Sequence, residues 1–148
     1  MPISLSVQTP VLIEGGCHVD GRGSLSFVNG FDFQDVERFF WVHSAEAGVP
    51  RGWSGHQRER RWFSVVHGEV LVAVVQPDDW QSPSCDLPVT RFLLSAARPQ
   101  VLYVPPGHAT GSLNLDPGAI LLIFSSGTLD QSKTDDFRFS VDRWPIKG

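Results

Sequence analysis

The chain has 148 residues, of which 41% are hydrophobic and 19% charged, and this balance excludes an intrinsically disordered or fibrous protein. Its formal net charge of −4 argues against a general nucleic-acid binder, because such proteins need a net basic surface. No apolar run approaches the ~20 residues that a membrane-spanning helix needs, and the N-terminus lacks a basic-then-apolar signal, so we expect a soluble, cytoplasmic protein. Cys17 and Cys85 lie far apart in the sequence and predict reduced thiols rather than a disulfide framework.

Glycine and proline are spread along the whole chain, where they separate short apolar runs in the rhythm of an all-β protein. The runs are nearly continuous in apolar character, which fits strands that are covered on both faces. We therefore expect a jelly roll or sandwich without helical periodicity, as one domain over residues 1–148. In chain order, the expected strands are Val11–Glu14, Ser24–Val28, Glu37–His43, Arg61–His67, Glu69–Gln76, Val89–Ser95, Gln100–Val104 and Ala119–Ser125.

Three clusters of polar residues stand beside glycine or proline at the ends of expected strands. They are Asp20–Leu25, Arg51–Gln57 and Val104–Gly111. Loops at strand ends commonly carry binding and catalytic groups, so these clusters are the candidate functional segments.

The order of these motifs resembles that of the cupin-fold nucleotide-sugar enzymes, dTDP-4-dehydrorhamnose 3,5-epimerase and the shorter dTDP-sugar 3,4-ketoisomerases. The shared pattern is D-x-R-G, then R-G-x-H-x-H (here R-G-W-S-G-H), then a hydrophobic run to glycine and a P-P-G turn. The segment Asp136–Ile146 is similar to the end of the epimerase, and the whole resemblance covers about residues 11–146. It implies an all-β, double-stranded β-helix (cupin jelly-roll barrel), a pocket for a dTDP-linked 4-keto sugar used in surface polysaccharide biosynthesis, and a strand-exchanged homodimer.

The resemblance also implies roles for individual residues, and the chain departs from the family at the catalytic base. The first His of R-G-x-H-x-H has that role in the family, whereas this chain has Ser54 there and keeps only His56. A serine hydroxyl needs its own activator to act as a base near pH 7, so Ser54 is expected to be a hydrogen-bonding pocket residue. Three roles are open for His56: the surviving acid/base, a donor that orients the ligand, or a buried histidine held by a backbone partner. The single tyrosine, Tyr103, lies in an apolar strand and does not match the epimerase's general acid.

Arginines are the expected ligands of the substrate's diphosphate. Arg22 and Arg51 match the arginines of the first two motifs, and Arg38 is a third candidate for a cation that faces the pocket. The alternative for Arg22 is a structural pair with Asp20. A solvated strand face would explain the run that ends at Arg61 without any ligand.

Aromatic and hydroxyl side chains complete the expected substrate site. Trp53 or Trp62 would stack on the base or sugar, and Thr110 stands where the epimerase has a histidine. Cupins often hold a metal ion through H-x-H, a glutamate and a later histidine, but Ser54 and Thr110 replace two of these ligands, so we expect no functional metal and no cofactor. Three functions therefore stay open: a metal-independent epimerase or ketoisomerase, a non-catalytic sugar-nucleotide-binding cupin, or a cupin that acts on an unrelated carbonyl substrate.

Overall fold

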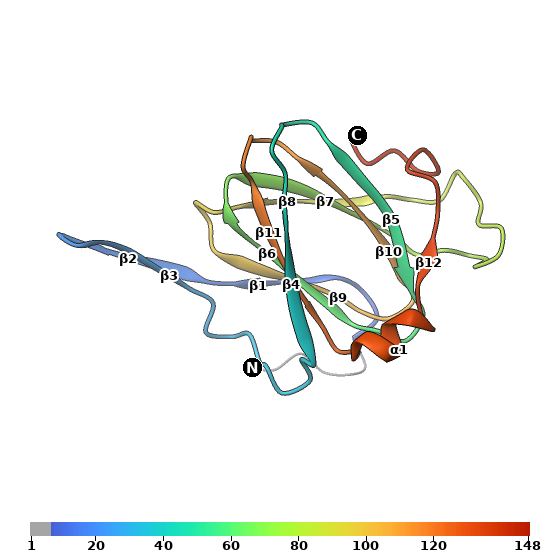
Figure 1. The fold of residues 1–148 in the computed structure, drawn as a ribbon, viewed down its shortest axis with the longest axis horizontal. Coiled ribbons are helices and arrows are strands. Elements are labelled where there is room, and N and C mark those ends of the chain that lie inside the picture. The colour runs from blue at the N-terminus through green and yellow to red at the C-terminus, as the bar shows by residue number, and fades with distance from the viewer. Residues whose placement is uncertain (1–6) are drawn as a thin grey trace.

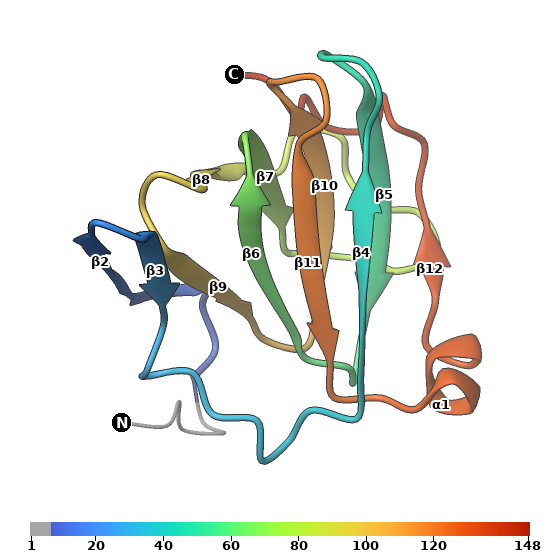
Figure 2. The same cartoon turned by 60° about the vertical axis from the view of Figure 1, so that its left-hand side comes forward.

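Two antiparallel sheets of five strands face each other and form a jelly-roll barrel (Figures 1 and 2). The structure is a computed structural model that describes residues 7–148. Sheet I has the order β1 (Val11–Glu14), β9 (Gln100–Val104), β6 (Arg61–His67), β11 (Ile120–Ser125), β4 (Arg38–His43). Sheet II has the order β12 (Phe137–Arg138), β5 (Pro50–His56), β10 (His108–Asn114), β7 (Glu69–Val75), β8 (Thr90–Ser95).

The expected all-β jelly roll is confirmed. The strands β1, β6 and β9 have the predicted bounds, and the other predicted strands differ by a residue at one or both ends. Sequence reasoning missed β5 and β10, which it interpreted as loops, and it also missed β2 (Gly16–Asp20), β12 and the short helix α1 (Leu129–Lys133). No helix in the part of the chain that the structure describes is long and apolar enough to cross a membrane.

The main core lies between the two sheets, and strand alternation builds it. On β7, Val70, Val72 and Val74 face this core, where they pack with Phe63 and Leu121 of sheet I. The intervening Ala73 and Val75 point to the other face of sheet II, where they are also buried. Because both faces of β7 are covered, its sequence is apolar from residue 70 to residue 75.

The outer face of sheet II is covered by the C-terminal segment. Trp144 is fully buried there and packs edge-to-face on Trp53, with ring centroids 5.2 Å apart. The Trp144 indole N–H donates to the carbonyl of Ser84, and the Arg91 guanidinium donates to the carbonyls of Pro145 and Ile146. These bonds fasten the segment across the sheet.

A separate hairpin, β2 (Gly16–Asp20) with β3 (Gly23–Phe27), extends away from the barrel (Figure 1). It forms a two-stranded sheet, and among the described strands none other pairs with it. Its apolar side chains Val19 and Leu25 are exposed. The Asp20–Leu25 cluster thus occupies the turn of a projecting hairpin.

Candidate functional site

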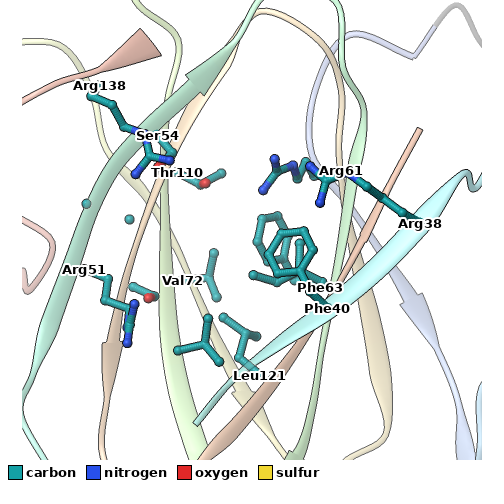
Figure 3. Close-up of a pocket in the computed structure, with 15 residues that line it drawn as sticks. Arg38, Phe40, Arg51, Ser54, Arg61, Phe63, Val72, Thr110, Leu121 and Arg138 are labelled. Carbon is teal, nitrogen blue, oxygen red and sulfur yellow. The ribbon is translucent and has the colours of Figure 1, made fainter. Parts of the chain in front are cut away.

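A cavity of about 370 Å³ lies between the two sheets, above the main core (Figure 3). The core residues Phe63, Val72 and Leu121 form its apolar floor. Polar and cationic side chains from β4, β5, β6, β10 and β12 line the rest. A concave site with an apolar floor and a few converging polar groups is the usual form of a small-molecule pocket.

The sheet II wall of the cavity is a row of polar side chains set by strand register. Thr110 pairs with Ser54 across β10 and β5, and Ser54 pairs with Arg138 across β5 and β12. The register shifts after Thr110, so that Ser112 pairs with Arg51 one step along the wall. Three hydroxyls and two guanidinium groups thereby line the same side of the cavity. Figure 3 shows Ser54, Thr110 and both arginines there.

The sheet I wall carries a second pair of arginines. Arg38 on β4 and Arg61 on β6 both pair with Ser125 of the strand between them, so they lie in one row. Their guanidinium carbons lie 5.0 Å and 5.3 Å from the centroid of the Phe40 ring (Figure 3). Burial, more than the neighbouring Arg38 charge, lowers the pKa of Arg61, but an arginine remains charged at any physiological pH.

A buried carboxylate holds this arginine pair in place. Glu59 accepts hydrogen bonds from Arg61 Nε and Ser132 Oγ, and Arg38 Nη2 donates to the same Ser132 Oγ at 2.8 Å. Burial by itself raises the pKa of Glu59, but the Ser132 hydrogen bond and the Arg61 charge outweigh it and hold the pKa below its ordinary value. The glycine at position 127 makes room for this carboxylate, because a Cβ there would lie 2.7 Å from Glu59 Oε1.

His56, the last residue of β5, is buried beside this cluster. Its Nδ1 lies 2.6 Å from the carbonyl oxygen of Asp135, which can only accept, so Nδ1 carries the proton and Nε2 keeps its lone pair. Nε2 has no hydrogen-bond partner among the described residues and lies 3.9 Å from Glu59 Oε2. Burial, and next the Arg61 charge, lower the pKa of His56, which is therefore neutral at pH 7. A neutral imidazole with a free Nε2 can act as a base.

The backbone around His56 is anchored by Asp135. Its carboxylate accepts the backbone N–H groups of Gln57, Arg58 and Glu59 at 2.7, 2.9 and 2.8 Å. The segment between β5 and β6 is thus tied to the residues after α1, and His56 is fixed with it.

The structure brings together four of the residues that the sequence singled out. Arg38, Arg51, Ser54 and Thr110 all line the cavity, whereas His56 is not among the lining residues, although it follows Ser54 on the same face of β5.

The two tryptophans expected to stack on the ligand do not reach the cavity. Trp53 is fully buried against Trp144 on the outer face of sheet II, and Trp62 lies on the outer face of sheet I against Tyr103. Neighbouring residues of a strand point to opposite faces, so Ser54 and Phe63 face the cavity while these indoles face away. The prediction that Trp53 or Trp62 stacks on the ligand is therefore wrong, because stacking requires a ring that the ligand can reach.

Arg22 also lies outside the cavity of its own chain. It is on the projecting hairpin, with its side chain exposed and its Nη2 2.7 Å from Asp20 Oδ2. This is the turn pair that the sequence offered as the alternative.

Sequence reasoning missed Arg61 and Arg138. Arg61 was assigned to a solvated face, but it is two residues before the inward-facing Phe63, and that spacing is the signal that places it inside. Arg138 alternates with Phe137 and Phe139, which pack on Trp80 outside the barrel, so Arg138 faces inward.

The expected absence of a functional metal stays a prediction. Within residues 7–148, no three or more His, Cys, Asp or Glu side chains are grouped as a metal site requires.

Two facing jelly-roll sheets around a polar, arginine-lined cavity define a cupin of the RmlC type. Solved structures of this type share the fold of the chain. Residues 11–141 match the family described as "FdtA: WxcM-like, C-terminal", and the chain belongs to this family. No curated protein matches the chain. The family resemblance inferred from the motifs is thus confirmed.

Solved structures of sugar-nucleotide enzymes share this fold. The rmlC epimerase of Mycobacterium tuberculosis has a TM-score of 0.71 and 25% identity, over 90% of this chain and 70% of that one. The 3,4-ketoisomerase QdtA of Thermoanaerobacterium thermosaccharolyticum, solved with TDP, has a TM-score of 0.69 and 19% identity, over 91% of each chain. The TDP-quinovose 3,4-ketoisomerase WlaRB of Campylobacter jejuni has a TM-score of 0.66 and 18% identity, over 90% of this chain and 95% of that one.

Proposed function

We propose that this protein binds a dTDP-linked 4-keto sugar in the cavity between its sheets and isomerises it without a metal, in the cytoplasm, for surface polysaccharide biosynthesis. The observation that carries the proposal is the wall formed by Arg51, Ser54, Thr110 and Arg138, which offers cations and hydroxyl groups to a phosphorylated sugar. A similar structure, QdtA of Thermoanaerobacterium thermosaccharolyticum, was solved with TDP-4-keto-6-deoxyglucose, which supports this substrate class.

The diphosphate is assigned to the sheet II wall. Arg51 lines the cavity, and Arg138 beside Ser54 adds a second guanidinium group. Arginine binds phosphate oxygens through two parallel N–H groups, which fixes the orientation of the ligand as well as its charge. Arg22 can serve the diphosphate only in the cavity of another copy, because it lies on the hairpin outside its own.

The isomerisation is assigned to His56. Its Nε2 would take the proton from the carbon next to the ketone, and the resulting enolate oxygen would be stabilised by the cations and hydroxyls of the cavity. The protonated imidazole then returns the proton, on the same face, to the former ketone carbon, while the proton of the hydroxyl on the neighbouring carbon passes to the former ketone oxygen, so that the ketone moves by one carbon. Because His56 does not line the cavity, this role requires the side chains of the wall to rearrange when substrate binds.

A second candidate, binding without turnover, is favoured by the composition of the cavity wall. The lining side chains are arginines, serines, a threonine and apolar groups, and none of them is a histidine, a cysteine or a carboxylic acid. A protein that kept its arginines but lost the family's base would bind the sugar nucleotide and leave it unchanged.

Deuterium exchange distinguishes the two candidates. Transfer of solvent deuterium into dTDP-4-keto-6-deoxyglucose is followed by NMR for the wild type, for His56→Asn, and for His67→Asn as a control at an exposed histidine. Exchange that is lost only in His56→Asn supports the isomerase. Binding of dTDP, seen as a shift in Tm, without exchange supports the binding protein. A ligand at 100 times its Kd adds about 2.7 kcal/mol of stability, so the absence of any shift with dTDP contradicts both.

Metal independence has its own test. Elemental analysis of protein purified without added metal should show no near-stoichiometric iron, manganese, nickel or zinc, and one of these metals at one equivalent per chain would contradict the proposal.

A homodimer is part of the proposal. The exposed Val19 and Leu25 on a hairpin that no other described strand pairs with, together with exposed Phe39 and Trp41 on β4, provide apolar surface for a second copy. Light scattering should give twice the chain mass of 16.4 kDa, and a value near one chain mass would exclude the dimer.

A further inference from the structure

The cavity has an arginine pair on each of its two opposite walls. Arg51 and Arg138 come from sheet II, and Arg38 and Arg61 come from sheet I (Figure 3). A dTDP-linked neutral sugar carries its negative charge on the diphosphate alone, and one arginine pair can bind that group. Before any enolate forms, the sheet I pair is therefore left without an anionic partner from such a ligand.

The charges at the sheet I wall do not cancel within the protein. Arg38 and Arg61 contribute two positive charges, and Glu59 is bonded to Arg61, whereas Arg38 donates to the neutral hydroxyl of Ser132. The adjacent Asp136 is paired with Arg138, with 2.8 Å between its Oδ1 and Arg138 Nε. With Glu59 paired to Arg61 and Asp136 to Arg138, Arg38 is the arginine of this wall that has no bonded carboxylate among the described residues. An unpaired charge at a largely buried wall is costly unless a ligand neutralises it.

The donors of this pair are already held in position. Arg61 is fixed through Nε by Glu59, Arg38 is fixed through Nη2 by Ser132, and the Phe40 ring supports both guanidinium groups. Arg38 Nε is buried and has no hydrogen-bond partner among the described residues. Fixed cationic donors with an unused N–H group form a prepared site for a small anion.

We infer that the ligand of this cavity is a nucleotide-activated sugar that carries a carboxylate, and that Arg38 and Arg61 bind that carboxylate on the wall opposite the diphosphate. The inference rests on the proposed function and specifies its substrate class. A carboxylate fits better than a second phosphate, because its single charge equals the one unbalanced charge, whereas a phosphate brings about −1.5 to −2. Its planar shape also matches the guanidinium fork.

Calorimetry with a matched pair of ligands tests the inference. dTDP-glucose and dTDP-glucuronate differ only at C6, which is a hydroxymethyl group in the first and a carboxylate in the second. We expect the wild type to bind the acidic sugar about tenfold more tightly or better, because charge-assisted hydrogen bonds are about twice as strong as neutral ones. In Arg38→Gln the ratio of the two affinities should fall to near one. Arg98→Gln, at an exposed arginine outside the cavity, should keep the wild-type ratio.

Each outcome has a definite meaning. Equal affinities in the wild type, with dTDP itself bound, overturn the inference and leave the proposed function standing. A preference that survives Arg38→Gln overturns the assignment to the sheet I wall. If dTDP and both sugars fail to bind, the proposed function fails, and the inference fails with it. Should Arg38→Gln not fold, Arg38→Lys keeps the charge but not the fork, and it should lower the ratio without abolishing it.

Discussion

Two arginine–carboxylate pairs in this protein have the same sequence spacing, but one is exposed to solvent and the other is buried. In the projecting hairpin, Asp20 pairs with Arg22, whose side chain is 91% exposed. At the base of the barrel, Glu59 pairs with Arg61, and their side chains are 3% and 13% exposed. An exposed pair contributes little, because water and salt screen it, whereas loss of one partner of a buried pair is strongly destabilising. The contribution of a pair to stability therefore depends on how deeply the surrounding structure buries it, and not on its local sequence.

The largest expected effect comes from removing the buried carboxylate charge. Glu59→Gln leaves Arg61 and Arg38 without a counter-charge at a largely buried wall, so it should lower the free energy of unfolding by about 3–5 kcal/mol. Asp20→Asn is the matched change in the hairpin and should leave the free energy of unfolding unchanged within error. Urea denaturation measures the free energy of unfolding of both variants. Similar losses in the two would show that burial does not make the Glu59 pair more important for stability than the Asp20 pair.

A smaller effect is expected from adding a methyl group to a glycine in each region. A Cβ at Gly55 would lie 2.6 Å from the Trp80 ring, so Gly55→Ala should displace that ring and cost about 1–3 kcal/mol. At Gly21, in the hairpin turn, a Cβ meets no atom within 4 Å, so Gly21→Ala should be nearly neutral. Thermal unfolding followed by tryptophan fluorescence tests both. A neutral Gly55→Ala would show that Trp80 does not pack closely on β5.

The smallest expected effects are on the pH dependence of stability, and the first of them comes from the buried histidine. Burial lowers the pKa of His56 below its ordinary value of 6.5, so below pH 6.5 the unfolded chain binds a proton that the folded chain does not. Stability should therefore fall as the pH drops from 6.5 through the folded pKa. In His56→Gln this part of the slope should disappear, whereas His18→Gln in the exposed hairpin should keep it.

At more acidic pH the buried carboxylate adds a second loss of stability. The pKa of Glu59 lies below its ordinary value of 4.5, so its stabilising charge is present above pH 4.5 and is lost as the pH falls through the folded pKa. Stability measured by urea denaturation from pH 7 to pH 3 should show both losses in the wild type. The acidic loss should be reduced in Glu59→Gln, and an unchanged acidic slope would assign it to other carboxylates.

The strands of sheet I could be predicted because their buried positions hold apolar residues in short runs that the sequence shows directly. The strands β5 and β10 could not, because the glycines and polar residues within them are also typical of loops. Their side chains face a cavity rather than a packed core, so Ser54 and Thr110 need not be apolar. Gly111 lies where a Cβ would approach Ile146 to 3.0 Å, so the segment that covers the sheet determines this residue, and the local sequence does not.

The motifs predicted which segments of the chain contribute to the candidate site. Arg51, Ser54 and Thr110 lie at the cavity as their motif positions suggested. The tryptophans were misplaced because a motif does not say which face of a strand each residue occupies. Trp53 faces outward because Trp144 covers it from 91 positions further along the chain, and no local pattern reports such a cover.

The C-terminal segment sets when the cavity can first exist during synthesis. The strand β12 completes the sheet II wall beside Ser54, and Trp144 seals the outer face of that sheet. A nascent chain emerges in order, so β5 can pair with β10 but lacks its other neighbour, β12, until residues 137–146 have been translated. The pocket is therefore assembled after translation of this segment, and a ribosome-tethered chain that lacks it has no complete site for a ligand to stabilise.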